Sequence, residues 1–126
     1  MHRRFKAAPT SELSCPDGIV QAVVAKSFRL RLLGLMGLGA TEIVPLLFPR
    51  CRSIHTRAMK APIDLVWLSV ERERARVLDV VESLGPGRHQ RFRGDRAARR
   101  SVAALELPPG DAIRLGLRPG AAVGLG

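Results

Sequence analysis

The apolar residues of this chain are gathered in short segments separated by turn-forming residues, a pattern that does not fit an architecture of long helices. Segments rich in valine, isoleucine and leucine and bounded by glycine, proline or charged pairs are typical of β-strands. The segments with this character are residues 19–25, 46–48, 51–59, 63–68, 76–81, 102–107 and 121–125. The chain is therefore expected to be rich in short strands.

Neighbouring residues give two of these strands an expected place in a sheet. Pro45 and Pro49 flank residues 46–48. Because proline cannot donate a hydrogen bond, it is confined to sheet edges and strand ends, and this strand is expected at such a place. Residues 63–68 are apolar on both faces apart from Asp64, which indicates a central strand covered on both sides.

Two short helices are also expected. Ser27 is a suitable N-cap, because its hydroxyl can accept a hydrogen bond from a free backbone N–H of the first turn. The residues that would form the buried face of this helix are Phe28, Leu32, Leu35 and Met36, and Gly37 and Gly39 would end it. One or two further helical turns are expected just before Gly116.

Two turns connect the expected strands toward the end of the chain. The charged residues 71–74 form a hairpin turn, and Pro119 and Gly120 suit the middle positions of a type II turn. No regular alternation of strand, helix and strand is present. The sequence predicts an α+β, mainly β fold, a compact barrel or sandwich of about six or seven short strands with two short helices.

The length of 126 residues suits a single hydrophobic core. Residues 1–15 combine basic side chains with a proline, threonine and serine stretch that lacks apolar periodicity. We therefore expect a flexible N-terminal lead-in over residues 1–15 and a single domain over residues 16–126.

Several sequence features bear on the location of the protein. The basic residues at the start are not followed by the apolar run of a secretory signal, and no stretch approaches the ~20 apolar residues of a spanning helix. Cys15 and Cys51 lie far apart in unlike contexts, which does not suggest a disulfide framework. A cytoplasmic protein without a transmembrane segment is expected.

The formal net charge of +10 raises the alternative of a basic nucleic-acid-binding protein. The richest basic stretch is the loop expected over residues 88–100, which holds six arginines and one aspartate. A solvated loop is the simpler interpretation, since the chain has only four phenylalanines, one tryptophan and no tyrosine with which to stack bases. The composition therefore favours a solvated loop over a nucleic-acid partner.

Three charged residues lie within otherwise apolar sequence, where an unpaired charge would be costly. Arg31 is therefore expected to pair with Glu106 or Asp64. With His55 and Thr56 nearby, these groups would form a polar patch at one end of the barrel. The patch could be a purely structural ion pair, or it could bind a small ligand, a peptide or a protein partner.

Cys51, His55 and Met59 recur at intervals of four residues and offer an alternative metal site. In an extended strand, however, neighbouring members would stand roughly 13 Å apart, too far for one ion without a bend. A related alternative is an enzyme with Cys51 as nucleophile, His55 as base and Asp64 as orienting group. The expectation is no catalytic residue, no metal and no cofactor.

Several motifs occur together in a familiar order. They are Arg31-Leu32-Leu33-Gly34-Leu35-Met36, Cys51-Arg52-Ser53-Ile54-His55-Thr56, Met59 with Pro62-Ile63-Asp64, and the stretch from Leu105-Glu106-Leu107-Pro108-Pro109-Gly110 to Leu115-Gly116-Leu117-Arg118-Pro119-Gly120. Over roughly residues 19–126 the chain resembles the bacterial and archaeal family called domain of unknown function 192.

The resemblance implies a small, mainly β domain without an assigned biochemical activity. Some members of the family are encoded near secretion or pilus genes. This chain departs from the family pattern at Gly37-Leu38, at Ser69-Val70-Glu71 and at Ala121, which affects surface turns rather than the fold. The expected function is a non-enzymatic binding or accessory module, and the resemblance alone implies an association with secretion or pilus systems.

Overall fold

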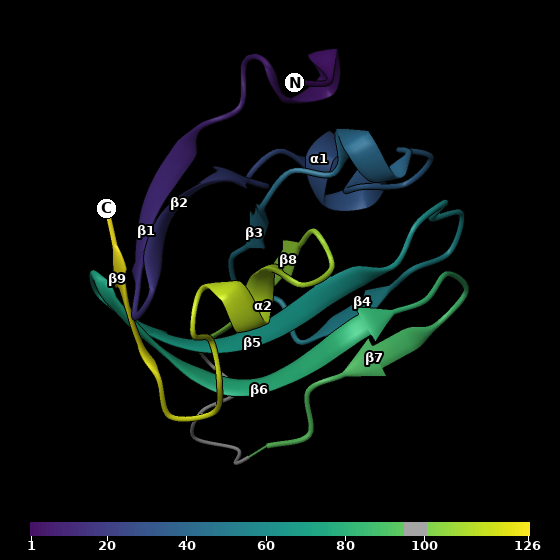
Figure 1. Ribbon diagram of the computed structural model, residues 1–126. Helices are drawn as coiled ribbons and strands as arrows, with labels where there is room; N and C mark the ends of the chain where they lie inside the picture. The colour runs from purple at the N-terminus through teal and green to yellow at the C-terminus, as the bar shows by residue number, and fades with distance from the viewer. Residues whose placement is uncertain (95–100) are drawn as a thin grey trace.

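A closed barrel of seven strands forms the centre of the protein (Figure 1). The computed structural model describes residues 1–94 and 101–126. The barrel strands, in their order around the barrel, are β1 (Thr10–Cys15), β2 (Gly18–Val24), β3 (Leu46–Phe48), β8 (Val102–Leu107), β5 (Ile63–Glu71), β6 (Arg74–Leu84) and β9 (Ala122–Leu125). The prediction of a mainly β barrel is confirmed.

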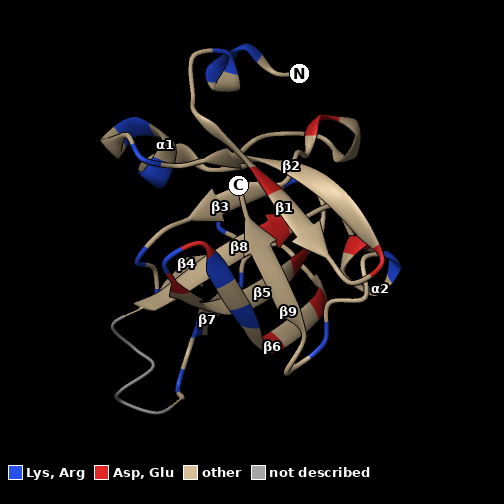
Figure 2. Ribbon diagram, turned by 90° about the vertical axis from the view of Figure 1, so that its left-hand side faces the viewer, with Lys and Arg blue, Asp and Glu red and all other residues tan. Residues whose placement is uncertain are grey.

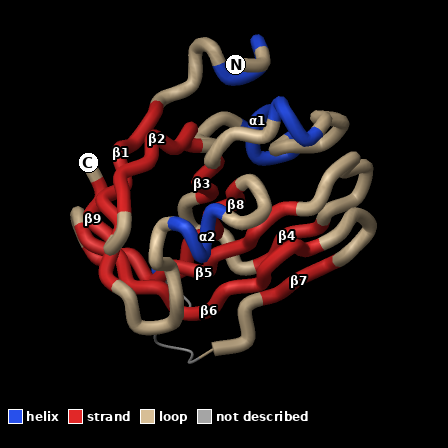
Figure 3. The backbone as a smooth tube through the Cα atoms, in the orientation of Figure 1, coloured by secondary structure: helices blue, strands red, loops and turns tan. Residues whose placement is uncertain are grey.

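Short helical elements and a small second sheet complete the fold (Figure 3). The helices are α1 (Phe28–Leu33) and α2 (Asp111–Arg114), with 3-10 turns η1 (Arg3–Phe5) and η2 (Ala40–Glu42). Outside the barrel, β4 (Ser53–His55) pairs antiparallel with β7 (His89–Arg91). Within the described ranges, no helix has the length and apolar character needed to cross a membrane.

The N-terminal segment differs from the expected flexible lead-in. Thr10–Cys15 is strand β1, which pairs with β2 over its whole length and with β9 at its end. Phe5 is fully buried in an apolar cluster that also contains Leu30, Leu35 and Leu38. The sequence gives little indication of this strand, because its residues are mostly small or polar and Leu13 is the one large side chain that it buries.

The strand between the two prolines also lies elsewhere than predicted. β3 is not an edge strand: it pairs parallel with β2 and antiparallel with β8. The flanking prolines do not interfere, because Pro45 and Pro49 stand outside the three residues whose N–H groups the barrel uses. The carbonyl of Pro45 even accepts a hydrogen bond from the Val23 N–H at 2.9 Å.

Helix α1 begins as predicted and ends early. The Ser27 side chain accepts a hydrogen bond from the Leu30 N–H at 3.1 Å, which confirms the N-cap. The helix ends at Gly34, whose φ of 48° lies in the left-handed region that glycine tolerates. Phe28 and Leu32 lie exposed on the helix, so the predicted buried face is wrong for these two residues.

Of the remaining local predictions, those of the two turns are confirmed, whereas the bounds of one strand and one loop are wrong. The turn before β6 and the type II turn are confirmed, the latter by a 2.9 Å hydrogen bond from the Ala121 N–H to the Arg118 carbonyl. The strand expected over residues 51–59 is only Ser53–His55, because the chain turns at Ala58 with a φ of 59°. Residues 88–100 were expected to be a loop, but β7 occupies part of this range, and residues 95–100 lie outside the described residues.

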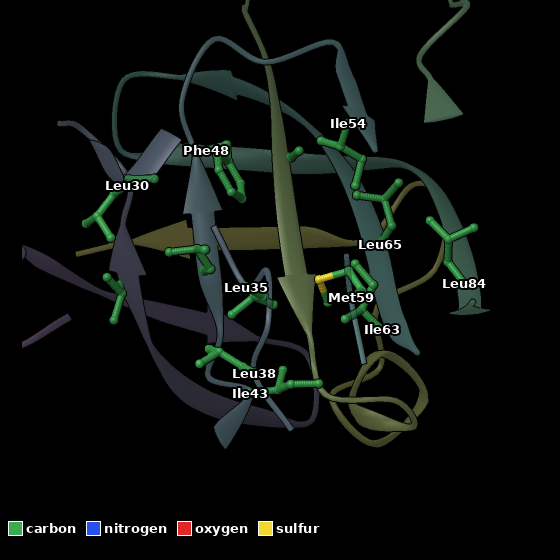
Figure 4. Close-up of a cluster of buried hydrophobic side chains, with 14 of the residues drawn as sticks. Leu30, Leu35, Leu38, Ile43, Phe48, Ile54, Met59, Ile63, Leu65 and Leu84 are labelled. Carbon is green, nitrogen blue, oxygen red and sulfur yellow. The ribbon is translucent and has the colours of Figure 1, made fainter. Parts of the chain in front are cut away.

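Two apolar clusters lie on the two sides of the barrel wall, and successive residues of a strand contribute to them in turn. In β8, Ala103, Leu105 and Leu107 face the interior cluster, which α2 completes at one end of the barrel. Val102 and Ala104 belong to the outer cluster, which Leu35, Phe48, Ile54 and Met59 help to form (Figure 4). The central strands β5 and β8 are therefore covered on both faces, as the sequence predicts for residues 63–68.

The carboxylate of Asp64 ties together one end of the barrel. It accepts hydrogen bonds from the N–H groups of Ser83 at 2.9 Å, Gly110 at 2.9 Å and Ala112 at 3.0 Å. Asp64 is fully buried. These three bonds compensate for the loss of hydration of the carboxylate and connect β5 to β6 and to the start of α2.

Replacement of Asp64 should therefore lower the stability of the folded protein. Asp64→Ala leaves three N–H groups without their acceptor, one of them on the buried Ala112, so we expect a loss of about 3 kcal/mol or more in the free energy of unfolding. Denaturant titration followed by circular dichroism measures it. The matched control Glu82→Ala changes an exposed β6 carboxylate and should shift stability by less than about 0.5 kcal/mol. Equal stability of the two variants would contradict the structural role of Asp64.

Candidate functional site

A small cavity lies where the outer face of β8 meets the end of α1 and strand β4. Its volume is about 170 Å³, and its lining includes Glu106, Arg31 and His55. The side chains of Leu35, Phe48, Ile54 and Met59 supply apolar walls, and Cys51 and Ser53 supply further polar atoms. The cavity thus combines one buried carboxyl group with an apolar body and a polar rim.

Glu106 is the group that distinguishes this cavity. It lies on the outer face of β8, between Leu46 of β3 and Leu65 of β5 in the strand register. Its side chain is 5% exposed, and in residues 1–94 and 101–126 its carboxyl group has no hydrogen bond or ion pair. Burial raises the pKa of Glu106 to about 8, because the charged form is poorly solvated there. At neutral pH the group is mainly protonated.

Arg31 does not form the expected ion pair within the described part of the chain. Its guanidinium donates to the backbone carbonyls of Pro49 at 2.7 Å, Arg50 at 3.3 Å and Ala25 at 3.5 Å. Arg31 therefore connects α1 to the chain that follows β3. It still lines the cavity, but its donors are directed to carbonyl oxygens rather than to Glu106.

The strand register explains why Glu106 and Asp64 do not share a site. In the antiparallel pair, Leu65 stands opposite Glu106 and Asp64 stands opposite Leu107. Residues opposite one another point to the same face, and neighbours along a strand point to opposite faces. Asp64 therefore points to the side of Leu107, which belongs to the interior cluster, whereas Glu106 points to the outer side.

Thr56 is likewise separate from the cavity. Its hydroxyl donates to the Gly85 carbonyl at 2.6 Å and accepts from the Arg88 N–H at 2.8 Å. These bonds hold the segment after β4 against the segment before β7. Of the five expected site residues, Arg31, His55 and Glu106 meet at the cavity, whereas Thr56 and Asp64 have structural contacts elsewhere.

The apolar walls of the cavity were not part of the predicted site. Leu35, Phe48 and Ile54 reach it from three separate segments of the chain. In the sequence each of them has the character of an ordinary core residue, so no signal distinguishes a wall of a cavity from filled core.

Cys51 is held in a state that does not favour thiolate chemistry. Its Sγ donates to the Ser53 carbonyl at 3.3 Å. Burial raises the pKa of the Cys51 thiol and the nearby Glu106 acts in the same direction, whereas the Ser53 backbone and Arg31 act in the opposite one. A nucleophile would require a lowered pKa instead.

The alternative metal set of Cys51, His55 and Met59 does line one cavity. Met59 is part of the buried outer cluster, and the Cys51 thiol donates its hydrogen bond to the Ser53 carbonyl. Throughout the described residues, no three or more histidine, cysteine, aspartate or glutamate side chains are grouped so that they could hold a metal ion. The arrangement gives the metal hypothesis little support.

The raised pKa of Glu106 should make stability depend on pH. Because the folded value of about 8 exceeds the ordinary 4.5, the folded protein retains a proton that the unfolded chain releases. The free energy of unfolding should fall as pH rises from about 4.5 to about 8, by up to about 1.4 kcal/mol per unit. In Glu106→Gln this decline should be largely absent, as denaturant titrations at several pH values will show. An unchanged slope in Glu106→Gln, with the exposed-site variant Glu82→Gln as control, would contradict this assignment.

Cys51 should react slowly with iodoacetamide. Since burial raises the pKa of its thiol, the thiolate fraction near pH 8 should be smaller than in a free cysteine derivative, and alkylation slower. Peptide mapping by mass spectrometry gives the rate, with N-acetylcysteine as the reference. Reaction of Cys51 faster than the reference would instead indicate an activated thiol and favour the nucleophile alternative.

Comparison with known proteins places the chain in a family. Two solved structures share the fold. The first is a protein of unknown function from Novosphingobium aromaticivorans, with a TM-score of 0.69, 22% identity and coverage of 92% of this chain and 84% of that chain. The second is a protein from Sinorhizobium meliloti described as a putative transcription regulator, with a TM-score of 0.64, 21% identity and coverage of 94% of each chain. No curated protein matches. The family model for DUF192, described as uncharacterized ACR, matches residues 12–125. The chain therefore belongs to the domain of unknown function 192 family.

Proposed function

We propose that this protein is a non-enzymatic binding module whose cavity takes a small cationic group attached to an apolar body. The observation that carries the proposal is the Glu106 carboxyl group, which faces the cavity without a hydrogen bond or ion pair among the described residues, while its oxygen atoms keep a little contact with solvent. Burial of an unpaired carboxyl group costs stability, so such a group suggests a function that requires it.

The size of the cavity limits the ligand. At about 170 Å³ it is smaller than the pockets that hold drug-sized molecules, which start at ~300 Å³. A cavity of about 150 Å³ can hold a molecule the size of benzene. The cavity therefore suits a short aliphatic chain or a single side chain of a peptide.

The lining indicates the chemistry of that ligand. Leu35, Phe48 and Ile54 would contact the apolar part, and Glu106 would receive the polar end. A protonated amine can form an ion pair with the ionised carboxylate, and the gain is large in a poorly solvated site. An anionic end would instead be repelled once this carboxyl group is ionised. The guanidinium of Arg31 is engaged with carbonyl oxygens at 2.7 Å and 3.3 Å, so it does not occupy the place of the amine.

The same chemistry could come from a free amine or from a lysine side chain of a partner protein. A free amine and a short lysine peptide distinguish the two sources, since a peptide that binds more tightly than the amine must gain contacts beyond the cavity.

The test uses n-butylamine as the probe and the uncharged n-butanol as its matched control, with binding followed by amide chemical shifts in NMR. Because the amine needs the deprotonated carboxylate, its affinity should rise about tenfold for each pH unit up to about 8. Glu106→Gln should abolish this pH dependence and weaken binding, whereas Glu82→Gln should change neither. Equal binding of butylamine and butanol, or full binding to Glu106→Gln, would contradict the proposal.

A further inference from the structure

We infer that the face formed by the N-terminal segment and α1, here called the α1 face, docks on an anionic lipid membrane surface. The face consists of exposed apolar side chains on α1 and cationic side chains around them: Phe28 and Leu32 with Arg3, Arg4, Lys6, Lys26 and Arg29. The α1 face adjoins the Glu106 cavity, which Leu32 also lines, but the inference does not depend on the proposed ligand.

The cationic part of the α1 face surrounds a surface hollow of about 850 Å³. All five cations named above line this hollow, together with His2, and no aspartate or glutamate does so. Figure 2 shows the basic residues of the N-terminal turn and of α1 at the same end of the molecule. Clustered cations of this kind are attracted to the negative surface potential of anionic bilayers.

The apolar part of the α1 face consists of two side chains that are largely exposed to solvent. Phe28 is 83% exposed and Leu32 is 62% exposed, although the Ser27 cap that precedes them is well formed. Residues four apart lie on the same side of a helix, so these two side chains point outward together. Exposed apolar side chains surrounded by cations are the composition of surfaces that insert shallowly into the headgroup region of a membrane.

The two parts are held together as one surface. The Arg4 guanidinium donates to the carbonyls of Gly34 and Met36, both at 2.9 Å, and these residues directly follow α1. Phe5 is fully buried and anchors the same segment to the outer cluster. The cations near the start of the chain therefore stay beside α1, and docking would not require the segment to become ordered first.

A membrane explains the α1 face better than a nucleic acid does. Both partners would attract the cations, but Leu32 has no favourable contact with phosphates and cannot stack on bases as Phe28 could. A bilayer accommodates both side chains, because acyl chains lie directly beneath the charged headgroups. Arg91 of the basic stretch lines a different hollow, together with Arg31, Arg50 and Arg52, and is not part of the α1 face.

Flotation with lipid vesicles tests the inference on the full chain. Phosphatidylcholine vesicles that contain phosphatidylglycerol should bind the protein at about 0.1 M salt and release most of it at about 1 M, where charges are screened. Pure phosphatidylcholine vesicles should bind much less. Equal binding to both kinds of vesicle, or no binding to either, would overturn the inference.

Substitutions then locate the contact. Phe28→Ser with Leu32→Ser should weaken vesicle binding about tenfold or more, since two apolar side chains lose their insertion. Lys26→Gln and Arg29→Gln should each weaken it about fivefold. The matched controls are Ile19→Ser with Ile113→Ser, which remove exposed apolar side chains elsewhere, and Arg118→Gln, and these should retain binding.

Two further measurements make the result decisive. Unchanged thermal unfolding of the variants is expected, because every substituted side chain is exposed, and it separates loss of docking from loss of fold. A labelled DNA duplex is titrated under the same salt conditions. Vesicle binding that is lost in the α1 variants supports the inference, whereas control variants that lose as much binding, or DNA binding without vesicle binding, refute it.

Discussion

Strands β5 and β8 are covered on both faces, and most of the structure depends on this constraint. The interior of the barrel takes one set of alternating side chains, and a second apolar layer on the outside takes the other. A polar side chain at any position of β8 is therefore removed from water, whichever way it points. Each such group must find a partner inside the protein or remain uncharged.

The two buried carboxyl groups of these strands meet that constraint in different ways. Asp64 on the interior side receives three backbone N–H groups, and its role is to join β5, β6 and α2. Glu106 on the outer side receives none, and its environment favours the protonated form. The contrast separates a carboxylate that the fold uses from one that the fold leaves accessible to a cavity, and our functional proposal depends on this difference.

The sequence predicted the individual strands better than their places in the barrel. Residues 63–68 and 102–107 have an apolar pattern that strand formation and burial both require, and they were identified correctly. The predicted position of β3 was wrong because proline lacks only the N–H group, and the sequence does not show that Pro45 contributes to the sheet through its carbonyl alone. β1 was missed because a barrel can pair a largely polar strand through its backbone alone.

The candidate site was only partly predictable, for a reason of register. That Asp64 and Glu106 would be buried follows from their apolar neighbours, but their separation depends on which residues stand opposite each other across β5 and β8. A shift of one residue would have placed both on one face. The partners of Arg31 were unpredictable for a related reason, since any sequence contains backbone carbonyls with which a guanidinium can pair.

The most direct test of this account is the ionisation of Glu106 itself. The carboxyl carbon of Glu106 can be followed by NMR as pH is changed, first without and then with butylamine. The account predicts a pKa of about 8 for the free protein and a clear decrease when the amine is bound. Titration near the ordinary value of 4.5, unchanged by the amine, would contradict it.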